Sequence, residues 1–274
     1  MTQVQEQTVV EGTFRGTRYT LEGAGEGEGP WLTLVHGVGS YLESWDGVIA
    51  ALGPGYRVLR YDLRGHGQSA KLPGPYSLDD FVGDLSALLD HLGVARTLLA
   101  GFSLGGLIAQ GLALEDPERL EKLILISTVA GRTQEEKERV RRRARTLAES
   151  GAVAHLSEAV ERWFTDDFIA RHPEVLEERR RRSMANDPAC YAAAYRVLAE
   201  SDLADRLPAI TTPTLVMTGE HDIGSTPRMA AVIAERVPDC RLHVFARLKH
   251  SILLEAPDQV AAQIKSFLEP DRLS

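Results

Sequence analysis

The stretch LLAGFSLGGLIA, residues 98–109, places a serine among glycines between two aliphatic runs. Glycine costs backbone entropy in a regular element, so a turn with three glycines in six residues must need their conformational freedom. Gly-x-Ser-x-Gly between a strand and a helix is typical of a sharp turn that strains the serine backbone and exposes its hydroxyl above a sheet. Gly101 and Gly105 would leave room for chain segments that a Cβ atom would block. Ser103 is therefore a candidate nucleophile, and a tight turn with an incidental serine is the alternative.

The segments around this turn predict alternating strands and helices, which is the pattern of a mostly parallel sheet with helices on both faces. Short apolar runs that end in polar residues or glycine read as strands buried on both faces. The predicted strands are a pair within 8–23 around a turn at Arg15-Gly16, then 30–37, 56–62, 96–102, 120–127, 213–219 and 240–246. The predicted helices between them are 78–92, 104–115, 227–237 and 257–268. The fold class is α/β.

A helical segment interrupts this alternation. From about Val129 to Arg206 there is no convincing strand, and the pattern predicts helices at 134–149, 152–164, 173–185 and 188–200. Thr133 and Glu136 form a capping box at the start of the first of them. We expect residues 1–128 and 207–274 to form the α/β core, and residues 129–206 to form a helical cap, or lid, over one edge of it.

Composition excludes several classes of function. The 274 residues carry a net charge of −8, which leaves no surplus of Lys and Arg for binding nucleic acid. Two cysteines are too few for a disulfide framework. Residues 1–12 have neither the basic start nor the apolar core of a signal peptide, and no apolar run approaches the ~18 residues of a membrane span. We expect a cytoplasmic protein that does not contact a membrane and that could form a homo-oligomer.

A serine nucleophile needs a base and an acid that holds the base in one tautomer. In this architecture the partners follow the serine along the chain, each after a later strand. His250 follows the last predicted strand and precedes the last helix, so it is the candidate base. The sequence GEHD after the preceding strand offers Asp222 as the acid, with Glu220 as the alternative.

An oxyanion formed at the reacting carbonyl needs backbone N–H donors. One normally comes from the residue after the nucleophile, here Leu104, where the predicted helix also directs its positive dipole end. The other normally comes from the loop after an earlier strand, and LVHGVGS at 34–40 offers Val38. We expect His36 in this loop to bond the backbone rather than to act in catalysis.

Two further clusters have a functional and a structural interpretation. Asp62, Arg64 and His66 could suggest a metal site, but no second group of ligands stands at usable spacing, so a hydrogen-bonded loop is the better interpretation. The runs RVRRRAR (139–145) and RRRR (179–182) could attract an anionic substrate. Flanking glutamates favour a solvated helix face instead.

The motifs HGVGS, YDLRGHGQS, GFSLGG, GEHD and KHSILLEAP resemble those of the α/β-hydrolase superfamily in order and spacing. Within it, the chain is most similar to the 3-oxoadipate enol-lactonase group, through YDLRGHGQSAKLPGPYSLDDFVGDLSALLDHLG, GFSLGGLIAQGLAL, VERWFTDDF and NDPACYAAAYRVLAESDL. The resemblance implies a helical cap over the triad and cofactor-free hydrolysis of an enol-lactone made during aromatic degradation. The loop at 36–40 departs from the Asn-Ser-Leu-Gly-Thr type of those lactonases, and has the form common in esterases and C–C hydrolases.

The sequence therefore predicts a serine hydrolase of small carboxylic esters or lactones that works through an acyl-enzyme and needs neither metal nor cofactor. The cap would supply the acyl pocket, with Trp163, Phe164, Tyr191 and Tyr195 as candidate substrate-binding residues. Hydrolysis of C–C bonds in ring-fission diketones, or perhydrolysis, could use the same triad. A non-catalytic receptor for a small ligand is a third interpretation. Epoxide hydrolysis and dehalogenation are disfavoured, because they need a carboxylate where Ser103 stands.

Overall fold

The computed structural model describes residues 9–23 and 29–268, except for the side chains of residues 150–158. Thr8, the first residue of the predicted strand pair, lies outside the described residues, as does most of the stretch 1–12, which has no predicted signal peptide.

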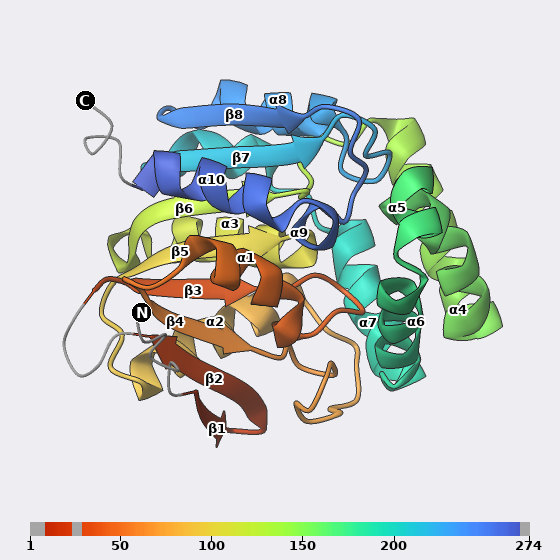
Figure 1. The fold of residues 1–274 in the computed structure, drawn as a ribbon, viewed down its shortest axis with the longest axis horizontal. Coiled ribbons are helices and arrows are strands. Elements are labelled where there is room, and N and C mark those ends of the chain that lie inside the picture. The colour runs from red at the N-terminus through yellow and green to blue at the C-terminus, as the bar shows by residue number, and fades with distance from the viewer. Residues whose placement is uncertain (1–8, 24–28, 269–274) are drawn as a thin grey trace, which may run out of the picture.

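A single sheet of eight strands forms the centre of the molecule (Figure 1). Its spatial order is β1-β2-β4-β3-β5-β6-β7-β8. Strands β1 and β2 form an antiparallel hairpin that pairs antiparallel with β4, and all other pairs are parallel. The predicted α/β fold with a mostly parallel sheet is confirmed. The strands are β1 (Val10–Phe14), β2 (Thr17–Gly23), β3 (Trp31–Val35), β4 (Arg57–Tyr61), β5 (Thr97–Phe102), β6 (Leu120–Ile126), β7 (Thr214–Gly219) and β8 (Cys240–Phe245).

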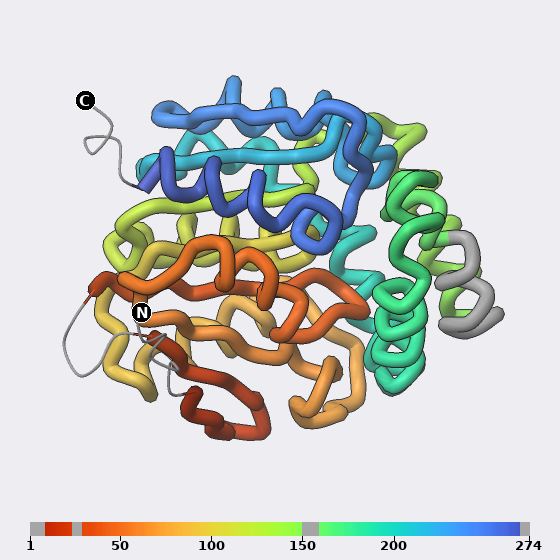
Figure 2. The backbone as a smooth tube through the Cα atoms, in the orientation of Figure 1, coloured from red at the N-terminus to blue at the C-terminus, as the bar shows by residue number. Residues whose placement is uncertain are grey.

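Helices cover both faces of this sheet, and a separate buried cluster fills each interface. One face carries α2 (Leu78–His91), α3 (Leu104–Glu115) and α8 (Pro227–Arg236). The other carries α1 (Asp46–Leu52), α9 (Ile252–Glu255) and α10 (Pro257–Leu268). The sequence analysis did not predict α1 and α9, which are only seven and four residues long. Short 3₁₀ turns lie at Leu42–Trp45, Pro117–Arg119 and Ala204–Ala209. Figure 2 shows the hairpin and β8 at opposite edges of the sheet.

Four helices stand together beyond the carboxyl ends of the strands (Figure 1). They are α4 (Gln134–Trp163), α5 (Asp166–Arg171), α6 (Pro173–Met184) and α7 (Pro188–Glu200), and we call them the insert helices. The prediction of separate helices at 134–149 and 152–164 is wrong, because α4 runs unbroken through Gly151. A glycine inside a helix costs only about 1 kcal/mol relative to alanine, and α4 also packs along α7. The predicted capping box of Thr133 and Glu136 starts α4.

Candidate active site

The turn between β5 and α3 holds Ser103 in a strained backbone conformation. Its φ is 55° and its ψ is −113°, a region that residues with a side chain rarely occupy. The surroundings fix this conformation: the Ser103 N–H donates to the Ile126 carbonyl at 2.8 Å, and the Thr128 hydroxyl donates to the Ser103 carbonyl at 2.8 Å. The turn thus presents the serine side chain at the carboxyl end of a central strand.

The glycines of the turn allow close approach of neighbouring chain segments. A Cβ atom on Gly105 would clash with the backbone oxygen atoms of Val35 and His36 in and after β3. A Cβ atom on Gly101 would clash with the Gly105 carbonyl at the start of α3. Both glycines are therefore required by backbone contacts that no flexible side chain can relieve.

Asp222 and His250 form a close pair at the carboxyl ends of β7 and β8. Asp222 Oδ2 lies 2.6 Å from His250 Nδ1. The other carboxylate oxygen accepts the backbone N–H groups of Gly224 at 2.8 Å and Ser225 at 2.9 Å. The Asp222 side chain is 1% exposed and the His250 side chain 13% exposed. Because an ionised carboxylate only accepts hydrogen bonds, this contact places the imidazole proton on Nδ1 and leaves Nε2 free as an acceptor.

Ser103, Asp222 and His250 line one pocket. The ring of Phe102, the residue before the serine, lies 5.1 Å from the His250 ring between centroids. Among the described residues no hydrogen bond joins the Ser103 hydroxyl to the imidazole, a bond that is often long without substrate. The alternative acid, Glu220, lies elsewhere: its half-exposed carboxylate accepts the N–H of Arg247 at 2.7 Å.

The predicted oxyanion residues lie at the same end of the sheet. Val38 is 8% exposed and lines the pocket, and no acceptor for its N–H is found among the described residues. Leu104 is the first residue of α3, where a helix has N–H groups without intrahelical partners. A Cβ atom on Gly37 would lie 3.0 Å from Ser103 Cβ, so the loop after β3 reaches the serine itself.

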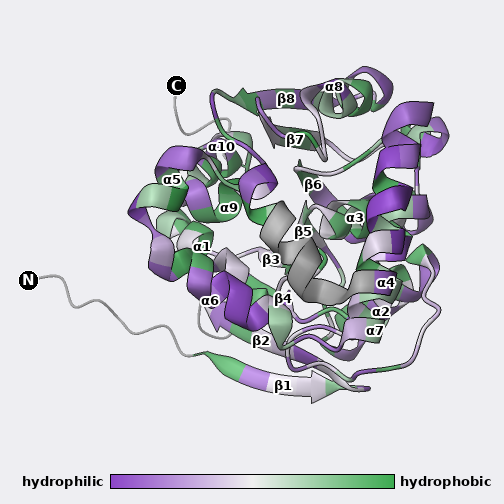
Figure 3. Ribbon diagram, turned by 90° about the vertical axis from the view of Figure 1, so that its right-hand side faces the viewer, coloured by the Kyte–Doolittle hydropathy of each residue, from purple (hydrophilic) through white to green (hydrophobic). Residues whose placement is uncertain are grey.

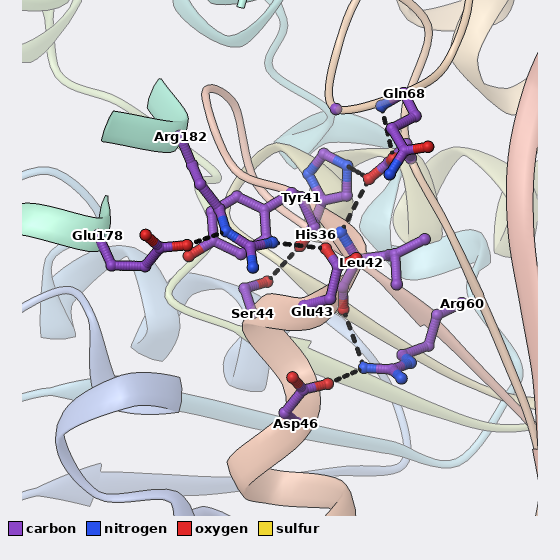
Figure 4. A network of polar contacts seen from close by, with 12 residues as sticks. His36, Tyr41, Leu42, Glu43, Ser44, Asp46, Arg60, Gln68, Glu178 and Arg182 are labelled. Carbon is purple, nitrogen blue, oxygen red and sulfur yellow. Dashed lines mark hydrogen bonds and ion pairs between the residues drawn. The ribbon is translucent and has the colours of Figure 1, made fainter. Parts of the chain in front are cut away.

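Buried polar groups hold the loop after β3 in place (Figure 4). His36 Nε2 accepts the N–H of Leu63 at 3.0 Å, and its Nδ1 lies 2.7 Å from the Gly37 carbonyl. Burial lowers the pKa of His36 to about 4, so the ring is neutral. Asp62 accepts backbone N–H groups from Leu42 at 2.9 Å and from Gln68 at 2.8 Å. His36 thus bonds the backbone, as expected, and Asp62 supports the loop through these hydrogen bonds.

Helix α6 contacts the same loop from the other side. The Ser183 hydroxyl donates to the Gly39 carbonyl at 3.1 Å, and both groups are buried. The amide of Asn186 reaches that carbonyl at 3.5 Å and accepts the N–H of Gly67 at 3.2 Å. Arg182 forms an ion pair with Glu43 at 2.9 Å (Figure 4). The insert helices and the candidate oxyanion loop are therefore linked directly.

The four predicted substrate-binding aromatics separate into two pairs. Trp163 and Tyr195 line the pocket. Phe164 and Tyr191 are fully buried and are absent from the pocket wall, which corrects the prediction for these two residues. Phe164 stacks on Phe168 at 5.2 Å between centroids, and Tyr191 packs against Gly39, so both serve the packing between elements.

The pocket wall contains five arginines, which the sequence analysis did not place there. They are Arg132, Arg139, Arg143, Arg162 and Arg179. Three of them, Arg139, Arg143 and Arg179, come from the two runs for which flanking glutamates favour a solvated helix face. That interpretation is wrong for the buried Arg179, whereas Arg139 is partly exposed and pairs with Glu135. The expectation of a solvated helix face does hold for Arg180 and Arg181, which are exposed and form ion pairs with Glu177 and Glu178. Four consecutive arginines cover every side of a helix, and one of them must face inward.

The described residues contain no group of three or more His, Cys, Asp or Glu side chains that could hold a metal ion. No helix in the described part of the chain is long and apolar enough to cross a membrane.

An eight-stranded, mostly parallel sheet with a strained serine turn between β5 and α3 defines the class of α/β hydrolases. The family described as "Serine aminopeptidase, S33" matches residues 30–257, and the chain belongs to this family of α/β hydrolases. The predicted resemblance is thereby confirmed at the level of the family.

The chain is similar to an enol-lactonase and to a hydrolase of a substituted succinate. The chain is 34% identical to 3-oxoadipate enol-lactonase 2 of Acinetobacter baylyi over 245 residues, 89% of this chain and 91% of the relative. It is 32% identical to (E)-2-((N-methylformamido)methylene)succinate hydrolase of the same organism, over 89% and 92% of the two chains. The crystal structure of an enol-lactonase from Burkholderia xenovorans superposes with a TM-score of 0.88 at 32% identity, covering 94% of this chain and 99% of that one.

Proposed function

We propose that the protein hydrolyses a small carboxylic ester or lactone through a Ser-His-Asp triad and an acyl-enzyme. Ser103 is the nucleophile, His250 the base and Asp222 the acid. The observation that carries this proposal is the 2.6 Å contact between Asp222 and His250, in the pocket that Ser103 also lines. Nucleophilic acyl transfer needs a serine, an imidazole close to it and a carboxylate that holds the imidazole. This pocket brings the three groups together.

The reaction begins when Ser103 Oγ attacks the substrate carbonyl and His250 Nε2 takes the hydroxyl proton. The resulting imidazolium is stabilised by Asp222, and the oxyanion binds the N–H groups of Val38 and Leu104. Collapse expels the alkoxide or enolate, which takes the proton from His250. Water, deprotonated by His250, then attacks the acyl-enzyme. Ser103 Oγ leaves and takes that proton back from His250, which releases the acid and restores the enzyme. In a lactone the leaving oxygen stays attached to the acyl group.

The names of the relatives support a substrate with an activated carbonyl. An enol-lactonase and a hydrolase of an N-formyl enamine act on acyl groups whose leaving atom is conjugated. We propose an enol-lactone or enol-ester-like substrate for this chain. Hydrolysis of C–C bonds in diketones, perhydrolysis and ligand binding without catalysis are the competing functions.

We also propose that residues 129–206 act as a cap over a core formed by 1–128 and 207–274. The support comes from the pocket wall, where α4 contributes Arg139, Arg143 and Trp163, and α6 contributes Arg179. Side chains of the insert helices would then surround the acyl group while the core supplies the reacting residues.

Kinetics on a substrate panel test the function. Wild type should hydrolyse enol-lactones and aryl esters, and Ser103→Ala should lower kcat by around 10⁶-fold. Vinylogous diketones tested beside them would reveal C–C hydrolysis if they turn over faster. Comparable turnover by wild type and clean Ser103→Ala would refute the proposal.

A further inference from the structure

Arg179 stands apart from the arginines beside it on α6. Its side chain is buried, with the residue 7% exposed, whereas the side chains of Arg180 and Arg181 are 53% and 65% exposed. Figure 3 shows α6 as strongly hydrophilic along most of its length, so burial of one of its charges is a departure from the rest of the helix. Arg179 lines the same pocket as Ser103 and His250.

The Arg179 guanidinium has unused hydrogen-bond donors. Nε and Nη1 are buried and have no hydrogen-bond partner among the described residues, and no described carboxylate lies within ion-pair distance. The guanidinium lies against aromatic rings, 5.2 Å from the Trp163 ring centroid and 5.9 Å from that of Tyr41, and the Tyr41 hydroxyl is also a hydrogen-bond neighbour of Arg179. Burial lowers the pKa of Arg179, opposed by Tyr41 and Tyr191, yet an arginine remains protonated at neutral pH.

An unpaired buried charge is unfavourable unless something compensates it. The fixed acids of the pocket are already engaged: Asp222 holds His250, and Glu136 pairs with Arg228 and accepts the N–H of Thr133. Among the arginines of the pocket wall, Arg179 is the one with buried donors that lack a partner among the described residues, whereas Arg139, for example, pairs with Glu135. The missing counter-charge is therefore expected to arrive with the ligand.

We infer that Arg179 binds a carboxylate carried by the acyl part of the substrate, and so selects esters or lactones of dicarboxylic acids. This inference rests on the proposed function, because it assigns the acyl group of that reaction. The planar guanidinium suits a carboxylate, and a charge-assisted bond made by a buried side chain is strong. The aromatic rings of Trp163 and Tyr41 keep the guanidinium in position before the ligand arrives. Arg179 is a specificity-determining residue and takes no part in bond cleavage.

A pair of isosteric substrates separates this role from a structural one. Mono-p-nitrophenyl glutarate ends in a carboxylate, whereas p-nitrophenyl 5-methylhexanoate ends in a neutral isopropyl group of the same shape. Wild type should prefer the glutarate ester by at least about tenfold in kcat/KM. Arg179→Met should lower kcat/KM for that ester by roughly 10- to 100-fold, mainly through KM, because a hydrogen bond to a charged group contributes about that factor. The neutral ester should change less than about threefold.

Controls address charge, folding and the identity of the anion. Arg179→Lys should keep part of the preference, and Arg181→Met, which removes an exposed arginine of the same helix, should change neither ester. Arg179→Met should unfold at the same or a higher temperature, because it removes an unpaired buried charge. Equal losses on both esters, or a wild type without preference, would overturn the inference. Inhibition by inorganic phosphate at lower concentration than by glutarate would overturn the choice of a carboxylate.

Direct binding distinguishes failure of this inference from failure of the proposed function. Calorimetric titration with glutarate, the product acid of the test ester, needs no turnover. Binding to wild type that is lost in Arg179→Met supports the carboxylate site even if neither ester is hydrolysed. Active enzyme that binds glutarate equally with and without Arg179 contradicts the site and leaves the triad assignment intact.

Discussion

Asp222 Oδ2 lies 2.6 Å from His250 Nδ1, at the ends of two neighbouring parallel strands. The carboxylate is itself fixed by the backbone N–H groups of Gly224 and Ser225. These bonds leave Asp222 one orientation and give His250 one tautomer, in which Nε2 is the acceptor nitrogen. His250 is thereby oriented for its proposed role as the base before any substrate binds.

Replacing Asp222 with Asn should reduce kcat by about 10³- to 10⁴-fold, because an amide can donate to Nδ1 and so favours the wrong imidazole tautomer. Folding should survive, since the side chain keeps its size. Steady-state kinetics on an aryl ester measure the effect. Glu220→Gln is the matched control, because Glu220 is half exposed and contacts Arg247 rather than the imidazole, and it should change kcat by less than about threefold. If Glu220→Gln lost more kcat than Asp222→Asn, Glu220 rather than Asp222 would be the acid.

Gly105→Ala should destabilise the fold by several kcal/mol, because its Cβ would clash with backbone oxygens of Val35 and His36 that cannot rotate away. Urea unfolding measures the change. Gly83→Ala in α2 is the control: nothing lies within 4 Å of its Cβ position, so the substitution should stabilise the protein by about 0.5–1 kcal/mol. Equal stabilities for the two variants would show that β3 and α3 do not approach as closely as described.

Ser183→Ala should lower kcat more than it raises KM. The variant removes the 3.1 Å hydrogen bond that α6 donates to the Gly39 carbonyl, next to the candidate oxyanion donor Val38. Complete loss of one oxyanion donor costs about 3 kcal/mol, so a displaced donor should cost about tenfold in kcat. Arg181→Gln on the same helix is exposed and should leave both constants unchanged. An unchanged kcat in Ser183→Ala would show that the link does not position the loop.

Stability should fall as the pH drops below about 6.5. Burial lowers the pKa of His36 to about 4, and burial together with the neighbouring His36 lowers that of His66 to about 3. Between those values and 6.5 the unfolded chain binds protons that the folded chain does not, so the free energy of unfolding is greatest above pH 6.5 and decreases toward pH 4. With two histidines the slope should approach roughly 3 kcal/mol per pH unit near pH 5.

Urea unfolding between pH 7.5 and 5 checks this expectation, in a range where most exposed carboxylates do not titrate. His36→Gln should flatten the slope by about half. A free energy of unfolding that stays constant over this range would mean that the buried rings take up protons in the folded state.

The sheet and the serine turn were predictable because local patterns determine them. A buried strand, three glycines and a helix at residues 98–109 leave few alternatives, and the order of later strands directs His250 and Asp222 to one end of the sheet. Asp222 was also predictable over Glu220 from the local sequence, because Asp222 stands at the tip of the loop that follows β7. The roles of these residues in catalysis stay a prediction.

The insert was less predictable because packing between helices decides its details. Ser150-Gly151 suggested a break that α4 does not have. Aromatic side chains on helices can face a pocket or a core, and Phe164 and Tyr191 face the core. Which arginine of the run 179–182 faces inward depends on how α6 sits against the core, which no local pattern encodes.

The central claim is that Ser103 becomes covalently acylated, and its most direct test is labelling with a fluorophosphonate followed by peptide mass spectrometry. Our account predicts one label per chain, located on Ser103, formed by wild type and strongly reduced in His250→Ala. A folded wild-type protein that remains unlabelled, or a label on another residue, would contradict it.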